Sequence, residues 1–235
     1  MQSAPRRVAL FDVDDTLTDR RAAFDLWAHE FAQRTSVPVQ WLTATDMELA
    51  GRRTAFFARL KKTYPAVARS VAELHDQYRH RSAELVPFRP DVRDALGKVR
   101  AEGWAVGAVT NGEPAAQRLK LKTAQLDDLV DSVIVSGAYG IRKPDPRLFH
   151  LAIEDLRATA DAEVWMVGDD LTTDIAGGQA AGINTVWLSH GRNRPVGAPE
   201  PSHTVHGVTE AASWLLARTG ASPVCPATPS GPRAS

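Results

Sequence analysis

Short apolar segments alternate with amphipathic segments along most of this chain. Five clear apolar runs and a weaker sixth, bounded by Gly, Asp, Asn or Ser, are typical of β-strands. They are residues 8–11, 104–109, 132–135, 164–167 and 185–188, with 203–206 as the weaker candidate. Between the later runs, apolar residues recur at helical spacing, which predicts helices. These segments are residues 113–129, 145–160, 172–181 and 209–218.

This alternation predicts the fold class. Strand–helix–strand repetition implies a parallel sheet with helices on both faces, joined by right-handed crossovers. The central runs are continuously apolar, as expected of strands that are buried on both faces. We therefore predict an α/β protein with a doubly wound, mostly parallel sheet.

One interval is too long for this rhythm. From Phe11 to Trp104 the chain far exceeds the dozen or so residues that a crossover needs. A helix over residues 90–102 would suffice, so residues 20–86 are surplus and are predicted to form an all-helical insertion. Helical spacing is clear over 22–34 and 66–85, and a third candidate, 47–62, contains Gly51.

The predicted domains follow from this insertion. Residues 1–19 and 87–218 form the core, and residues 20–86 form the helical insertion. Residues 219–235 are rich in Pro, Ser, Ala and Gly, which predicts a disordered tail.

Composition narrows the range of partners. The 28 Lys and Arg residues balance 28 Asp and Glu residues, which argues against a nucleic-acid binder that neutralises phosphates broadly. No apolar run approaches the roughly 18 residues of a membrane span, and the single Cys225 cannot form an internal disulfide. We expect a soluble, cytoplasmic protein without nucleic-acid or membrane partners. The oligomeric state, monomer or homodimer, stays open.

Chemically active side chains follow four successive strands. Strand ends of a parallel sheet meet at one edge, where α/β proteins bind ligands. These residues are Asp12, Asp14 and Asp15 after the first strand, Thr110, Asn111 and Gly112 after the second, Lys143 after the third, and Asp169, Asp170 and Asp174 after the fourth. Taken alone, the first acids could instead cap the next helix. Their shared location with the other groups favours a ligand site.

These residues resemble the four motifs of the haloacid dehalogenase-like (HAD) hydrolase superfamily. Asp-x-Asp-x-Thr stands at residues 12–16, the Thr and Lys motifs at Thr110 and Lys143, and Gly-Asp-x-x-x-x-Asp at residues 168–174. The resemblance covers about residues 7–188, and the helical insertion matches the C1-type cap of that family. We call residues 20–86 the cap. The segments FDVDDTL, TNG and KPDP are most similar to the small-molecule phosphatases that include N-acylneuraminate-9-phosphatase and pyrimidine 5′-nucleotidases.

The resemblance implies a role for each motif. Asp12 would be the nucleophile that forms an aspartyl phosphate, and Asp14 would be the general acid and base. Thr110, with the N–H groups of Asn111 or Gly112, would bind the phosphoryl oxygens. Lys143 would neutralise the intermediate, since phosphoryl transfer depends mainly on positioning and charge stabilisation.

The resemblance also implies a Mg²⁺ cofactor. Asp12, the backbone carbonyl of Asp14 and Asp169 would supply oxygen ligands, which suit this ion. Asp174 would orient water or Lys143 from outside the metal's ligands. Asp170 would act there too, through hydrogen bonds.

The predicted function is hydrolysis of a small phosphate ester. Dehalogenases of the superfamily lack a second acid, because a halide leaves without a proton, so Asp14 favours an alkoxide leaving group. A phosphomutase would keep the same acids and remains an alternative. A non-enzymatic phospho-aspartate receiver or binding protein is a further alternative, which the insertion and Asp14 disfavour.

The cap would decide the substrate, but its sequence does not name one. Arg52 and Arg53 could bind a carboxylate or second phosphate, or be exposed helix arginines. The aromatic residues Trp27, Trp41 and Phe56 are expected in the core of the cap. Three histidines near the end of the chain match no zinc spacing and are expected at the surface. They are His190, His203 and His206.

Overall fold

The core is a six-stranded, all-parallel sheet of order β3-β2-β1-β4-β5-β6, which confirms the predicted α/β class. The computed structural model describes residues 5–49 and 52–218. The strands are β1 (Arg7–Phe11), β2 (Ala105–Thr110), β3 (Ser132–Val135), β4 (Glu163–Gly168), β5 (Asn184–Leu188) and β6 (His203–Val205). All six apolar runs, including the weaker last one, are therefore strands.

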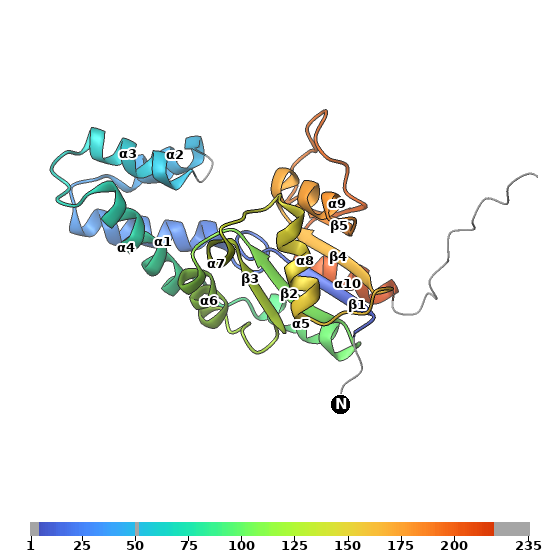
Figure 1. Cartoon of the computed structure of the whole chain (residues 1–235). Coiled ribbons are helices and arrows are strands. Elements are labelled where there is room, and N and C mark those ends of the chain that lie inside the picture. Colours follow the sequence, from blue (N-terminus) through green and yellow to red (C-terminus); the bar gives the residue numbers. More distant parts are fainter. Residues whose placement is uncertain (1–4, 50–51, 219–235) are drawn as a thin grey trace, which may run out of the picture.

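Helices cover both faces of the sheet (Figure 1). In β1, Ala9 and Phe11 face one apolar cluster, whereas Val8 and Leu10 face another. This alternation with a period of two, apolar on both sides, is expected of a strand between two helical layers. The first layer contains α5 (Pro90–Ala101), α6 (Pro114–Thr123) and α10 (Val208–Ala217), and the second contains α8 (Pro146–Asp155) and α9 (Ala176–Ala180). Two short elements complete the core, α7 (Ser136–Tyr139) and the π-helical turn η1 (Leu171–Ile175).

Two core helices end earlier than their apolar spacing predicts. Past the end of α6, Gln125 takes a φ of 56°, and past α8, Arg157 takes a φ of 53°. The next N–H groups, of Leu126 and Ala158, then bond back to carbonyls five residues earlier. This left-handed ending satisfies the last carbonyls of a helix and usually carries glycine. Because neither position is glycine, no residue in the sequence marks these helix ends.

In its described parts, residues 20–49 and 52–86, the insertion contains four helices, which lie at one side of the sheet (Figure 1). They are α1 (Arg20–Arg34), α2 (Val39–Leu49), α3 (Arg53–Thr63) and α4 (Val71–Glu84). Their shared apolar cluster contains Trp27 and Phe56, and Trp41 packs against it, as expected of cap-core aromatics. The division into core and cap domains at residues 20–86 stays a prediction.

The predicted single helix over residues 47–62 is wrong. Its place is taken by the end of α2 and most of α3, and residues 50–51 lie outside the described chain. Leu42 of α2 and Phe57 of α3 are buried in the same cluster, so two separate helices supply it with apolar side chains.

None of the helices in residues 5–49 and 52–218 combines the length and apolarity needed to cross a membrane. The predicted disordered tail, with Cys225, lies outside the described residues.

Candidate active site

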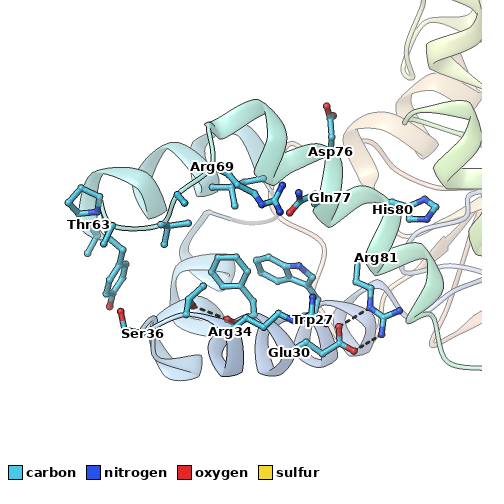
Figure 2. A pocket seen from close by; sticks show the side chains of 18 residues that line it. Trp27, Glu30, Arg34, Ser36, Thr63, Arg69, Asp76, Gln77, His80 and Arg81 are labelled. Carbon is cyan, nitrogen blue, oxygen red and sulfur yellow. Dashed lines mark hydrogen bonds and ion pairs between the residues drawn. The ribbon is translucent and has the colours of Figure 1, made fainter.

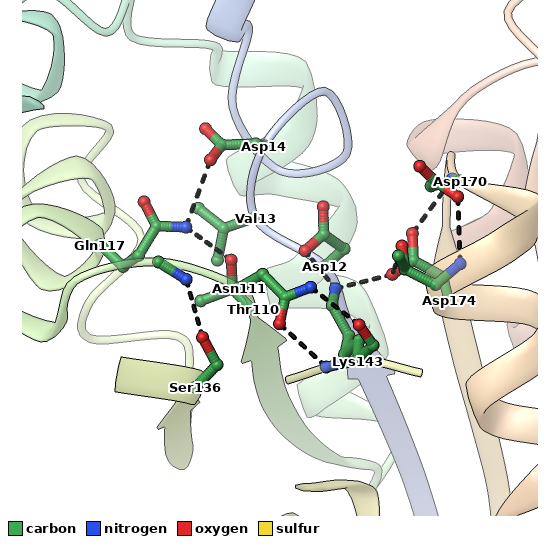
Figure 3. A network of polar contacts seen from close by, with 12 residues as sticks. Asp12, Val13, Asp14, Thr110, Asn111, Gln117, Ser136, Lys143, Asp170 and Asp174 are labelled. Atoms are coloured by element: carbon green, nitrogen blue, oxygen red, sulfur yellow. Dashed lines mark hydrogen bonds and ion pairs between the residues drawn. The ribbon is translucent and has the colours of Figure 1, made fainter. Parts of the chain in front are cut away.

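The ends of β1, β2 and β4 bring the predicted residues together (Figure 3). Phe11, the last residue of β1, pairs in register with Ala108 of β2 and Val167 of β4. The Asp12 N–H then donates to the carbonyl of Val167 at 3.0 Å, which fixes the chain just past the strand. Because the three strands are parallel and in register, the segments that follow them emerge at one edge.

Lys143 is the centre of the polar network. Its Nζ lies 2.5 Å from Asp12 Oδ1 and 2.6 Å from Asp174 Oδ1, and its side chain is only 2% exposed. The side chain of Asn111 holds the backbone of this residue, donating to the Lys143 carbonyl at 3.1 Å and accepting from its N–H at 2.9 Å. A loop lysine is thus held at a fixed position between two carboxylates.

Three carboxylates converge beside this lysine. Oxygens of Asp12, Asp169 and Asp174 lie within 4.8 Å of one another and could hold a metal ion. Burial raises the pKa of Asp12 to about 7 against the opposing effect of Lys143, and Asp174 adds repulsion. Burial, with repulsion from the carboxylates of Asp12 and Asp174, raises the pKa of Asp169 to about 8. A bound cation would relieve this repulsion, and the all-oxygen donors fit a hard divalent ion.

The side chain of Asp174 belongs to the group of three carboxylates, whereas that of Asp170 caps a helical turn beside it. Asp174 was expected to act from outside the metal's ligands, but its carboxylate lies among the three that could ligate. Asp174 Oδ1 pairs with Lys143, and Asp174 Oδ2 accepts from the Asp170 N–H at 3.1 Å. The Asp170 side chain accepts from the N–H groups of Thr172 and Thr173 at 2.7 and 3.0 Å, so it caps the first turn of η1.

The Asp14 carboxylate points to α6 and away from the other acids (Figure 3). Both of its oxygens lie 2.7 Å from Lys120 Nζ, and one lies 3.3 Å from Gln117 Nε2. Burial acts to raise the pKa of Asp14, but Lys120, Arg20 and Gln117 together hold that pKa below its usual value. Sequence reasoning missed Lys120 and Gln117, although their spacing places them on one face of the helix after Thr-Asn-Gly.

The Thr-Asn-Gly turn is itself tightly bonded. Thr110 is buried, and its Oγ1 accepts from Gln117 Nε2 at 2.5 Å. The Gly112 N–H, expected to bind phosphoryl oxygens, donates to Ser136 Oγ at 3.0 Å. The turn therefore brings the Thr110 hydroxyl to the site, with one of the two candidate N–H donors engaged elsewhere.

Arg192 and His190 contact Asp169 and Asp15 at the same edge of the sheet. Arg192, which sequence reasoning missed, contacts the Asp169 carbonyl at 2.7 Å and its carboxylate at 3.2 Å. His190 Nε2 lies 2.8 Å from the Asp15 carbonyl, and His203 stacks on a tryptophan ring. No histidine belongs to a group that could hold a metal within the part of the chain that the structure describes.

A cleft of about 1140 Å³ lies over these residues and is lined on its other side by the cap. Core residues such as Asp12 and Lys143 line one wall, and cap residues such as Arg53 and Tyr78 line the other. The cleft has room for a phosphate and an attached organic group.

A second pocket, of about 1060 Å³, lies within the cap (Figure 2). Trp27 and Phe31 stack at 4.9 Å between ring centres, and Glu30 pairs with Arg81 at its rim. None of the strand-end residues lines it, so the chemistry expected of the chain belongs to the first cleft.

Known proteins are similar to this chain over most of its length. A model of haloacid dehalogenase-like hydrolases matches residues 7–182. Glyceraldehyde 3-phosphate phosphatase from Pyrococcus abyssi is 32% identical over 201 residues, which are 79% of this chain and 82% of that protein. Pyrimidine 5′-nucleotidase YjjG from Escherichia coli is 32% identical over 139 residues, 59% of this chain and 61% of its own length.

Solved structures share the fold. The HAD-hydrolase YfnB from Bacillus subtilis, in a form bound to magnesium, has a TM-score of 0.74 at 24% identity, covering 90% of this chain and 99% of that one. These matches confirm the resemblance that the four strand-end motifs indicated.

Proposed function

Because the chain belongs to the haloacid dehalogenase-like hydrolase family, we propose that it is a Mg²⁺-dependent phosphatase that forms an aspartyl phosphate on Asp12. It is a phosphoric monoester hydrolase, as its relatives named phosphatase indicate. The observation that carries the proposal is the convergence of the Asp12, Asp169 and Asp174 carboxylates, with the buried Asp12 and Asp174 both paired to the Lys143 ammonium.

Asp12 supplies the nucleophile for the first step. Its oxygen forms a bond to phosphorus while the bond from phosphorus to the ester oxygen breaks, and Asp14 gives its proton to that leaving oxygen. Lys143, already 2.5 Å from Asp12, and the Thr110 hydroxyl offset the charge on the phosphoryl oxygens.

Asp14 serves the second step in the opposite direction. It takes a proton from water, the water oxygen forms a bond to phosphorus, and the bond to Asp12 breaks to release inorganic phosphate. Lys120 keeps the Asp14 carboxylate on the leaving-group side of the cleft before the first step. For the first step this contact has to loosen, since the protonated acid no longer forms an ion pair.

The carboxylates of Asp12 and Asp169, with Asp174 beside them, would hold Mg²⁺. The ion would neutralise part of the phosphate charge and fix its orientation. The backbone carbonyl of Asp14 remains the third protein ligand expected from the family resemblance.

Phosphate release tests the proposal directly. We expect purified protein with Mg²⁺ to release phosphate from an aryl phosphate and from some members of a panel of small phosphorylated metabolites. EDTA should abolish the release, and added Mg²⁺ should restore it. Absence of metal-dependent release across the panel would remove the phosphatase proposal, and isomer formation without net release would indicate the phosphomutase.

Mg²⁺ binding is expected to strengthen as pH rises from about 6 to about 9. Without a cation, the pKa values of about 7 for Asp12 and about 8 for Asp169 keep part of both groups protonated at neutral pH. The ion binds the ionised forms, so binding releases protons and low pH opposes it. Calorimetric titration in two buffers of different ionisation enthalpy measures that release. Affinity that is constant over this range would contradict the prediction.

The substrate class is a small phosphorylated metabolite, and cytoplasmic location is proposed with it. The relatives act on different phosphates: one is named for glyceraldehyde 3-phosphate and another for pyrimidine nucleotides. The cap wall of the cleft is therefore where this chain's own preference has to be found.

A further inference from the structure

The cap wall of the active-site cleft is cationic. Of the described residues that line the cleft, those from the cap include four arginines and no aspartate or glutamate. These arginines are Arg20, Arg52, Arg53 and Arg79. The acidic residues of the cleft all come from the core. Guanidinium groups thus line the space that the leaving group of a substrate would fill, although three of them also pair with an aspartate.

Arg53 is the most firmly held of these arginines. Its guanidinium lies 4.7 Å from the ring centre of Phe24 and 4.6 Å from that of Tyr78, and its side chain is only 13% exposed. Nη1 pairs with Asp46, but Nη2 is buried and has no hydrogen-bond partner among the described residues. Aromatic rings position a guanidinium without using its N–H donors, so Arg53 keeps donors that a ligand can take.

Arg20, which lines the same cleft, also has a buried guanidinium nitrogen without a hydrogen-bond partner among the described residues. Its Nε pairs with Asp15 at 2.7 Å, while its buried Nη1 has no hydrogen-bond partner within the described chain. Arg20 and Arg53 line the same cleft as Asp14. Tyr78 lines it too, and both arginines oppose the rise of its pKa to about 12 that burial causes. The two arginines therefore belong to the same cleft as the acid that would protonate the leaving oxygen.

We propose that the leaving group of the substrate carries a second anionic group, a carboxylate or a phosphate, which binds to Arg53 and Arg20 on the cap. Both anions match the planar donors of a guanidinium, so the shared chemistry is a small oxyanion. This inference rests on the proposed phosphatase function and adds its substrate class.

A neutral leaving group fits this wall less well. It would leave two buried guanidinium nitrogens without partners, and a buried donor without a partner costs free energy. Asp46 and Asp15 each engage only one side of their arginine, so the remaining donors are not needed to hold the cap together. An oxyanion supplies the missing acceptors, and it does so only when the substrate is present.

Matched pairs of substrates test the proposal. One pair is 3-phosphoglycerate and glycerol 3-phosphate, which differ in the carboxylate. The other is ribulose 1,5-bisphosphate and ribulose 5-phosphate, which differ in the second phosphate. We expect kcat/KM for the anionic member of at least one pair to exceed that of its partner by about tenfold or more, and the favoured pair identifies the anion.

Arg53→Met is expected to reduce this ratio to near one. Arg59→Met is the matched control, because Arg59 lies on the same helix, pairs with Glu48 and does not line the cleft. The ratio should survive in that variant. A ratio that persists in Arg53→Met would overturn the assignment to Arg53.

A measurement on the unmodified protein guards against a variant that fails to fold. Glycerate should inhibit wild-type phosphate release at about tenfold lower concentration than glycerol. Wild type that hydrolyses both members of each pair equally, with equal inhibition by glycerate and glycerol, would overturn the second-anion proposal and leave the phosphatase function standing. Wild type that hydrolyses no phosphate ester would overturn the phosphatase function first.

Discussion

Asp12→Asn is expected to lower kcat for phosphate release by at least about 10⁴-fold, the scale of losing a catalytic nucleophile. An amide oxygen is a poor nucleophile, and no aspartyl phosphate can form on it. The substitution keeps the size of the side chain, and Lys143 keeps Asp174 at 2.6 Å as a partner. Loss of activity should therefore exceed any loss of folding.

Acid-quenched reactions with labelled substrate provide the measurement. Wild type should carry label on Asp12, and Asp12→Asn should carry none, while circular dichroism shows both proteins folded. Asp161→Asn is the control, because the Asp161 side chain is 71% exposed and does not line the cleft. Label on another residue, or activity in Asp12→Asn above a tenth of wild type, would show that Asp12 is not the nucleophile.

Lys143→Met is expected to affect both stability and catalysis. It removes the cation between Asp12 and Asp174, whose side chains are 10% and 1% exposed, and leaves their charges unpaired. Breaking a buried pair in this way typically costs about 3–5 kcal/mol of unfolding free energy. The rate should also fall by about 10²–10³-fold, because one fixed charge opposite the phosphoryl oxygens is lost.

Urea unfolding with and without Mg²⁺ measures the effect on stability, and phosphate release with Mg²⁺ measures the effect on catalysis. Mg²⁺ should recover more unfolding free energy in Lys143→Met than in wild type, since the ion replaces part of the missing charge. Lys98→Met, at an exposed position on α5, is the control and should behave as wild type. Equal stability of Lys143→Met and wild type without metal would mean that the lysine does not compensate these carboxylates.

The strands and their order along the chain could be predicted because each is a local property. Residues 8–11 are continuously apolar, and β1 is buried between two helical layers, as that pattern indicates. Helix ends were less predictable. Gln125 and Arg157 adopt left-handed backbone without being glycine, and the packing of Leu126 inside the core accompanies one of these ends.

In the candidate site, too, some residues could be predicted from the sequence and others could not. Several of its residues follow strands along the chain, namely the acids after β1 and β4 and the segment with Lys143. Their position after strands is enough to predict that they meet at one edge of the sheet. Their partners were not visible. Lys120 reaches Asp14 across 106 residues of sequence, and no local pattern marks such a pair.

By itself, then, the sequence determined the doubly wound sheet, the helical insertion and the set of residues at the strand ends, because periodicity and strand-end position depend on neighbours along the chain. Only the tertiary structure decided which of these carboxylates share Lys143, which one Lys120 holds, and that Arg53 lies in the wall of the cleft between two aromatic rings. Those outcomes depend on how separate elements pack, and packing joins residues whose spacing along the chain carries no information about their contact.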